Sequence, residues 1–164
     1  HVIAKLDDAK KACEIKGKKL TYKTFVHENF IEGDVNTLVK YFSEYLDGCE
    51  KGLHIWGGES SVNLPEKPGR GGRNQQLALL MAEKIQNKDI LFLSAGTDGT
   101  DGPTNDAGGL VDGNTINLGR KYNLDHKTYL KNADSGNYLE KSKSLITTGP
   151  TGTNVMDLIL AIKK

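Results

Sequence analysis

Apolar residues recur at helical spacing in several stretches of the chain, most clearly between residues 34 and 48. The apolar face of that stretch consists of Val35, Leu38, Val39, Phe42 and Leu46. Steps of three and four residues predict an amphipathic helix. Asp34 or Asn36 can cap its start, because a short polar side chain accepts a hydrogen bond from the free backbone N–H groups there. The helix is expected to end near Gly48.

Weaker helical patterns occur elsewhere in the chain. One helix is expected from Ala4 to about Lys16, with Gly17 as a left-handed stop. Another is expected from about Gln75 to Gln86, directly after a glycine-rich stretch. Shorter helices are expected around residues 114–122 and 136–143.

Segments of strand length lie between these helices. Alternating polar and apolar residues predict a strand at 20–26, and short apolar segments predict strands at 53–56 and from Leu145. Residues 90–95 are apolar almost throughout, which is typical of a parallel strand covered on both faces. A last apolar run spans residues 158–162.

The alternation of strands and helices with short connections predicts an α/β fold. We expect a mostly parallel sheet sandwiched by helices, forming a single three-layer domain over residues 1–164. No change in composition divides the chain into two parts.

Composition excludes several classes of protein. With 37% hydrophobic and 26% charged residues, the chain is neither disordered nor a membrane protein, and no apolar run reaches the roughly 18 residues of a membrane span. A net charge of +1 gives no reason to expect a nucleic-acid partner. Two distant cysteines, Cys13 and Cys49, and the lack of a secretory signal favour a cytoplasmic location. The chain begins at His1 without a methionine, so a signal or a whole domain can lie upstream.

The first glycine-rich loop, Gly69 to Asn74, precedes a predicted helix. Free backbone N–H groups at a helix start attract an anion, and Arg70 and Arg73 add guanidinium groups suited to a carboxylate or a phosphate. A mobile loop with two solvated arginines and Asn74 as a cap explains the same residues equally well. The spacing matches neither a Walker loop nor a dinucleotide fingerprint.

The second loop, Gly96 to Gly109, follows the buried strand at 90–95 and contains Asp98, Asp101 and Asp106. In open α/β sheets, ligands bind at the carboxyl ends of the strands. Carboxylates in a flexible loop suit Mg²⁺, which takes one or two of them together with waters and substrate phosphates. Aspartate and glycine also form ordinary turns, but so many together favour a functional loop.

The third loop, Thr147 to Asn154, contains a Gly-Pro-Thr-Gly turn. Successive N–H groups in such a turn can bind an anion, although a tight turn before the last strand explains it as well. Glu59 follows two glycines at a strand end, a good position for a ligand contact or for a cap.

Several segments together resemble the MOFRL domain, the C-terminal domain of the glycerate 2-kinase family, also called glycerate kinase type 2. The resemblance covers most of the chain. The matching segments are Ile31–Asp34, Gly57–Val62, Gly69–Leu79, Gly96–Thr104, Thr148–Asn154 and Asp157–Leu158.

The resemblance implies part of a two-domain enzyme that phosphorylates D-glycerate with ATP and Mg²⁺. An N-terminal Rossmann-like domain of the same chain would complete the cleft, so the isolated chain is expected to show no turnover. Arg73, Asp98 and Asp101 would be catalytic, and Asp98, Asp101 and Asp106 would hold the metal. The residues expected to bind substrate or another anion are Glu59, Arg70, Asn74, Thr97, Thr104, Thr148, Thr151, Thr153 and Asn154.

Two other functions stay open. The family has also been named hydroxypyruvate reductase, which would require a nicotinamide site, and this chain contains no dinucleotide fingerprint. A non-catalytic module that binds small anions is the third possibility. The chain also departs from the family pattern: Gln76 stands where the family has glutamate, and this places a direct chemical role at that position in doubt. Two other departures, Gly109 and Gly136-Asn137-Tyr138, look like local loop variation.

Overall fold

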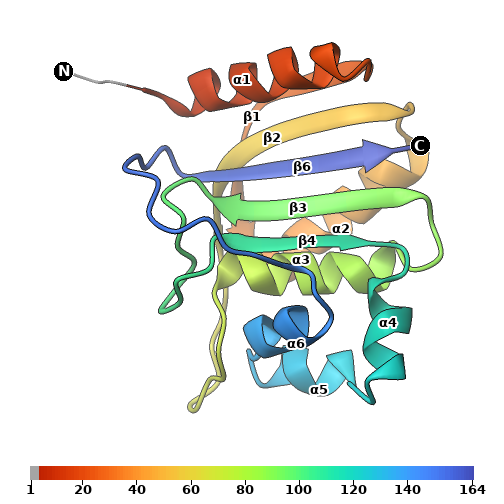
Figure 1. Cartoon of the computed structure of the whole chain (residues 1–164), viewed down its shortest axis with the longest axis vertical. Helices are drawn as coiled ribbons and strands as arrows, with labels where there is room; N and C mark the ends of the chain where they lie inside the picture. The colour runs from red at the N-terminus through yellow and green to blue at the C-terminus, as the bar shows by residue number, and fades with distance from the viewer. Residues whose placement is uncertain (1–3) are drawn as a thin grey trace.

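A computed structural model describes residues 4–164, in which helices and strands alternate along the chain (Figure 1). Residues 1–3 of the predicted domain lie outside the described residues. The helices are α1 (Leu6–Lys19), α2 (Val35–Gly48), α3 (Arg73–Lys84), α4 (Thr115–Lys121), α5 (His126–Lys131) and α6 (Ser135–Lys141). The strands are β1 (Thr24–Asp34), β2 (Gly52–Ser61), β3 (Ile90–Gly96), β4 (Gly108–Asp112), β5 (Leu145–Ile146) and β6 (Asp157–Lys163).

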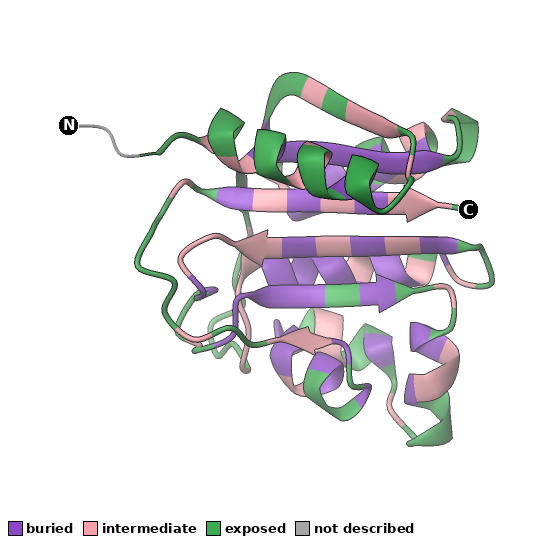
Figure 2. Ribbon diagram, turned by 45° about the horizontal axis from the view of Figure 1, so that its top comes forward, coloured by how far each residue is buried: buried purple, intermediate pink, exposed green. Residues whose placement is uncertain are grey.

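The strands form one sheet with the order β1-β2-β6-β3-β4-β5. Helix α1 crosses one face of this sheet near β1 and β2, whereas α2 and α3 lie on the opposite face (Figures 1 and 2). The predicted α/β class with helices on both sides of a sheet is therefore confirmed.

The predicted strand direction is wrong. Only the pair β1–β2 is parallel, and β2–β6, β6–β3, β3–β4 and β4–β5 are antiparallel among the described residues. The sheet is mixed because β6, the last strand in the sequence, lies between β2 and β3 and runs against both. An apolar run indicates that a strand is buried, but it carries no information about direction.

The core lies between the sheet and α2 and α3. All five predicted apolar residues of α2 are buried, and Phe42 packs edge-on against Trp56 of β2 and Phe92 of β3, with ring centroids 5.2 and 5.4 Å apart. Such aromatic contacts stabilise a core beyond the area they bury. The aromatic cluster thus fixes α2 against the middle of the sheet.

Both ends of α2 are capped by side chains. The Asp34 carboxylate accepts a hydrogen bond from the backbone N–H of Asn36 at 2.9 Å, so Asp34 is the cap that the sequence offered. At the other end, the Lys163 ammonium donates to the carbonyl oxygens of Leu46 and Cys49, at 2.7 and 2.9 Å. A cation at a helix C-terminus also interacts favourably with the helix dipole.

Several element boundaries differ from the prediction. Helix α1 continues through Gly17, which is not left-handed but packs so closely on Leu53 that a Cβ would lie 2.5 Å from its side chain. Strand β1 begins at Thr24 and ends at Asp34, later than predicted. Strand β4 and helix α5 have no counterpart in the prediction.

Stacked rings connect β1 to β2. His27 lies 4.3 Å from Trp56 and Phe25 lies 4.6 Å from His54, measured between ring centroids in nearly parallel planes. The His54 ring contacts the Tyr45 hydroxyl at 3.1 Å through Nδ1. Burial, together with the smaller effect of the neighbouring His54 ring, lowers the pKa of His27 to about 4.

This stack predicts a loss of stability in acid. The pKa of His27 in the fold lies below the value of about 6.5 for an unfolded chain, so protonation favours unfolding. Its contribution is complete above about pH 6.5 and declines as the pH falls toward 4. Between pH 7 and pH 5 we expect the free energy of unfolding to fall by about 2 kcal/mol more in this protein than in the variant His27→Phe. Urea unfolding at the two pH values measures this difference. Equal losses in the two proteins would contradict this expectation.

Candidate active site

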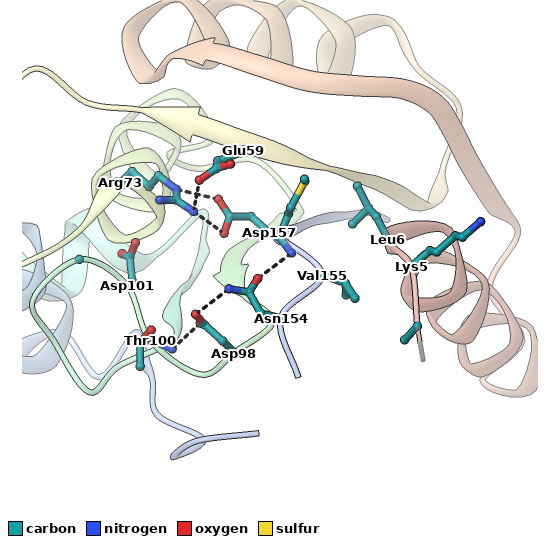
Figure 3. A pocket seen from close by; sticks show the side chains of 13 residues that line it. Lys5, Leu6, Glu59, Arg73, Asp98, Thr100, Asp101, Asn154, Val155 and Asp157 are labelled. Carbon is teal, nitrogen blue, oxygen red and sulfur yellow. Dashed lines mark hydrogen bonds and ion pairs between the residues drawn. The ribbon is translucent and has the colours of Figure 1, made fainter. Parts of the chain in front are cut away.

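The candidate site lies at the edge of the sheet where β2 and β3 end and β6 begins. Because β6 is antiparallel to both neighbours, its first residue, Asp157, pairs with Gly58 near the end of β2 and with Gly96 at the end of β3. A cavity of about 490 Å³ opens there (Figure 3). It is lined by Ala4, Lys5, Leu6, Glu59, Arg73, Asp98, Thr100, Asp101, Gly102, Asn154, Val155, Met156 and Asp157.

Arg73, the first residue of α3, is held by two carboxylates. Its Nε and Nη2 atoms donate to the two carboxylate oxygens of Asp157, at 2.9 and 3.1 Å, and Nη2 lies 3.2 Å from the Glu59 carboxylate. These contacts, above all the hydrogen bonds to Asp157, raise the pKa of Arg73 above its ordinary value. Arg73 and Glu59 therefore reach the cavity as predicted, but the guanidinium is already paired.

Asp157 is a site residue that the sequence prediction missed. It is 2% exposed and occupies the first position of β6. Its partners in register are Gly58 on β2 and Gly96 on β3, which have no side chains. The sequence did contain a signal for this residue, because Asp157 starts an otherwise apolar strand. A carboxylate in such a buried strand requires a charged or hydrogen-bonding partner.

Asp101 occupies the anion site at the start of α3. Its carboxylate accepts hydrogen bonds from the backbone N–H groups of Asn74 and Gln75, at 3.1 and 2.8 Å, and from the Asn74 side chain at 3.3 Å. Burial raises the pKa of Asp101 to about 6, against the opposing effect of these hydrogen bonds. The sequence offered this helix start either as a site for an external anion or as an ordinary loop, and the carboxylate of Asp101 occupies it.

Asn74 and Thr104 help to hold Asp101 at the start of α3. Asn74 is 1% exposed and accepts a hydrogen bond from the Ser94 hydroxyl, so it supports Asp101 from inside the core. The Thr104 hydroxyl donates to the Asp101 carbonyl at 2.8 Å and accepts from the Gln75 amide at 2.9 Å. Neither residue lines the cavity, in contrast to the predicted ligand contacts.

Asp98 lies beside the cavity and holds the second and third loops together. Its carboxylate accepts from the Thr100 backbone N–H at 2.9 Å and from the Asn154 amide at 3.4 Å. The Thr97 hydroxyl donates to the Met156 carbonyl at 2.7 Å. Asp98 and Asn154 thus lie where the sequence placed them, on one rim with Arg73.

The threonines of the third loop do not line the cavity. Thr148 and Thr153 are exposed, and the Thr151 hydroxyl donates to the Thr97 carbonyl. Thr97, Thr148, Thr151 and Thr153 thus form the framework of the two loops instead of a ligand-binding wall.

Arg70 and Asp106 belong to a separate cluster outside the cavity. Arg70 donates to Asp106 and to Glu140, both at 2.6 Å, and the Thr147 hydroxyl donates to the other oxygen of Asp106 at 2.6 Å. The predicted metal set of Asp98, Asp101 and Asp106 is therefore wrong as a set. No group of three histidine, cysteine, aspartate or glutamate side chains within residues 4–164 is arranged to hold a metal ion.

Gln76, where the chain departs from the family pattern, lies away from the cavity. Its amide donates to the Leu130 carbonyl at 3.0 Å, and the residue is 8% exposed. The missing carboxylate at this position therefore leaves the cavity unchanged.

The cavity wall carries more negative than positive groups. Its carboxylates are Glu59, Asp98, Asp101 and Asp157, and its basic residues are Lys5 and Arg73. Carboxylates accept hydrogen bonds from hydroxyl groups, and a guanidinium donates to a carboxylate in two parallel bonds. The wall therefore offers several acceptors for hydroxyl groups and one guanidinium as a donor to a carboxylate.

Comparison with known proteins gives consistent matches. Residues 52–157 match the model of the MOFRL family. The chain is 51% identical over 109 residues to a D-glycerate 2-kinase of Thermotoga maritima, which covers 66% of this chain and 26% of the relative. It is 35% identical over 155 residues to a glycerate 2-kinase of Pyrococcus horikoshii, which covers 90% of this chain and 35% of the relative. The chain thus spans about a third or less of the curated relatives it matches.

Two solved structures share the fold. A glycerate kinase from Thermotoga maritima superposes with a TM-score of 0.93 at 34% identity, over 100% of this chain and 42% of that one. A protein from Pyrococcus horikoshii superposes with a TM-score of 0.92 at 33% identity, over 99% of this chain and 39% of that one. In both, the whole of this chain corresponds to a part of a longer protein.

Proposed function

The chain belongs to the MOFRL family, and from that premise we propose that it is part of an enzyme that transfers a phosphoryl group from ATP to D-glycerate. The relatives named D-glycerate 2-kinase and glycerate 2-kinase support the reaction. The observation that carries the proposal for this chain is the cavity in which Arg73 and Asp98 lie on one rim. That wall matches glycerate, which has one carboxylate and two hydroxyl groups.

Phosphoryl transfer depends mainly on positioning and on neutralising spreading charge. In the proposed complex, Arg73 donates to the glycerate carboxylate with the N–H groups that Asp157 leaves free. Asp98 accepts a hydrogen bond from the hydroxyl group that attacks the phosphate. Asp101 lies at the same rim and accepts hydrogen bonds from the backbone N–H groups of Asn74 and Gln75, the two residues after Arg73. It thereby fixes the start of α3 and the position of Arg73.

The proposal includes Mg²⁺ and ATP. Asp98 fits as one carboxylate ligand of Mg²⁺, because its carboxylate is partly exposed, and this ion takes its other ligands from water and phosphates. When bound, Mg²⁺ would neutralise the charge of the transferred phosphate. The cavity wall offers four carboxylates and two basic groups, so it does not suit a triphosphate. We therefore place the nucleotide phosphates on a part of the enzyme beyond this wall.

We propose that an N-terminal domain of the same polypeptide completes the site. The greater length of the curated relatives supports this, since the chain spans 26% and 35% of two of them. The cavity lies where β2 and β3 end and β6 begins, and a second domain would supply a further wall there. A single wall excludes little water, and the isolated chain should therefore have no turnover.

A cytoplasmic location is also part of the proposal. Cys13 and Cys49 are both free thiols, as expected in a reducing compartment. No helix in the described part of the chain is long and apolar enough to cross a membrane.

A coupled assay tests the proposed reaction. The full-length enzyme that contains this chain is expected to form ADP only when D-glycerate, ATP and Mg²⁺ are all present, and the 164-residue chain alone is expected to form none. Activity is measured by ADP release, with a parallel assay of hydroxypyruvate-dependent oxidation of NAD(P)H. Nicotinamide oxidation without ADP release would overturn the kinase in favour of a reductase. Turnover by the isolated chain would contradict the need for a second domain.

A further inference from the structure

We propose that Asp157 is a positioning residue, which fixes the Arg73 guanidinium in the orientation that binds the carboxylate of the substrate. This inference rests on the proposed function, and it adds a residue that the sequence prediction did not contain. In this scheme Asp157 acts through Arg73, which donates hydrogen bonds to both of its oxygens, and not by direct contact with the substrate.

The hydrogen bonds divide the guanidinium into an occupied and a free edge. A guanidinium has two edges that bind a carboxylate through paired N–H groups, one formed by Nε and Nη2 and the other by Nη1 and Nη2. Asp157 occupies the first edge, with distances of 2.9 and 3.1 Å. Nη1 donates to no described side chain or carbonyl, so this half of the second edge is free, while its Nη2 half is contacted by Glu59.

The surrounding strands hold Asp157 in place. Gly58 and Gly96 flank it on both neighbouring strands, and a Cβ at position 96 would lie 3.6 Å from a carboxylate oxygen of Asp157. The preceding residue, Met156, has a left-handed backbone with φ 71°, and its carbonyl accepts two hydrogen bonds from Thr97. A residue held so firmly can transmit its orientation to Arg73.

Glu59 has a different relation to the same arginine. Its side chain is 52% exposed, against 3% for Asp157, and makes a single contact of 3.2 Å with Nη2. Nη2 belongs to both edges, so Glu59 lies where a substrate carboxylate would approach. A substrate carboxylate can displace an exposed side chain but not one that is buried in the sheet.

The test compares two buried aspartates in the full-length enzyme. Asp157→Asn removes the charge that aligns Arg73. Asp106→Asn removes an equally buried partner of Arg70, which does not line the cavity. Both variants should unfold at a lower temperature than the wild type. Only Asp157→Asn is expected to raise KM for D-glycerate, by roughly tenfold to hundredfold, the range of a lost hydrogen bond to a charged group. KM for ATP should change less than about twofold, and calorimetric titration with D-glycerate should show the same loss of affinity.

Each outcome decides the proposal. An unchanged KM for D-glycerate in Asp157→Asn, with a lower unfolding temperature, would reduce Asp157 to a structural role. A parallel rise of both KM values, or a similar rise in Asp106→Asn, would also overturn positioning. If Asp157→Asn does not fold, Asp157→Glu is measured instead, because it keeps the charge but shifts the carboxylate, and the same rise in KM is expected. Normal glycerate turnover in an Arg73→Ala enzyme would instead remove Arg73 from the site, whereas the absence of D-glycerate-dependent ADP release by the wild type would refute the proposed function itself.

Discussion

Replacement of Arg73 by alanine is expected to lower the turnover of D-glycerate by at least about a hundredfold in the full-length enzyme. Arg73 is the only arginine that lines the cavity within residues 4–164, and removal of one preorganised donor at a charged reacting group costs about this much. Steady-state ADP release measures the effect. Turnover within a few-fold of the wild type would remove Arg73 from the site.

The same substitution should also cost stability, which the sequence alone did not predict. Without Arg73, the Asp157 carboxylate stays buried with no partner, and breaking a buried ion pair in this way costs roughly 3 kcal/mol. Arg70→Ala is the matched control, since it leaves the buried Asp106 without its arginine outside the cavity. We expect similar decreases in unfolding temperature for the two variants, and a large loss of turnover only for Arg73→Ala.

Gly72→Ala is expected to destabilise the fold by about 3–5 kcal/mol and to abolish turnover. A Cβ at position 72 would lie 2.4 Å from the Asp101 carboxylate and 2.5 Å from its backbone. The carboxylate would have to leave the N–H groups of Asn74 and Gln75, so overpacking adds to the loss of charged hydrogen bonds. Arg73 lies between Gly72 and Asn74, and the site would be displaced with the helix start. Urea unfolding and ADP release measure the two effects.

Gly48→Ala provides the comparison for that substitution. Gly48 is the last residue of α2, and a Cβ there would meet nothing within 4 Å. Alanine is the better helix former, so the change should be neutral or slightly stabilising. If the two glycine variants lost equal stability, the contact between Gly72 and Asp101 would not be the cause.

The elements with strong periodicity were predictable from the sequence. The bounds of α2 and β3 agree with prediction to within one or two residues, because their apolar residues face a single core. Strand β4 was not predicted, since it begins with two glycines and extends a glycine-rich loop. A Cβ at Gly108 would lie 2.0 Å from the Ser94 carbonyl, so this glycine serves the close pairing of β4 with β3.

The candidate site was predictable in its location but not in its internal partners. The sequence placed Arg73, Asp98 and Asp101 on one rim, and all three line the same cavity. It could not show that Asp101 caps α3 or that Asp157 pairs with Arg73, because the paired residues lie 26 and 84 positions apart. Such pairings depend on strand order, and the position of β6 between β2 and β3 is the feature that local patterns do not contain.

The position of β6 between β2 and β3 also determines when the sheet can be completed during synthesis of the protein. Strands β2 and β3 do not pair with each other, so no sheet hydrogen bonds connect the pair β1–β2 to β3, β4 and β5 until β6 has left the ribosome and inserted between them. Long-range pairing of this kind slows assembly and leaves strand edges exposed to aggregation in the meantime. Because Asp157 is the first residue of β6, the proposed site is completed in the same late event that closes the sheet.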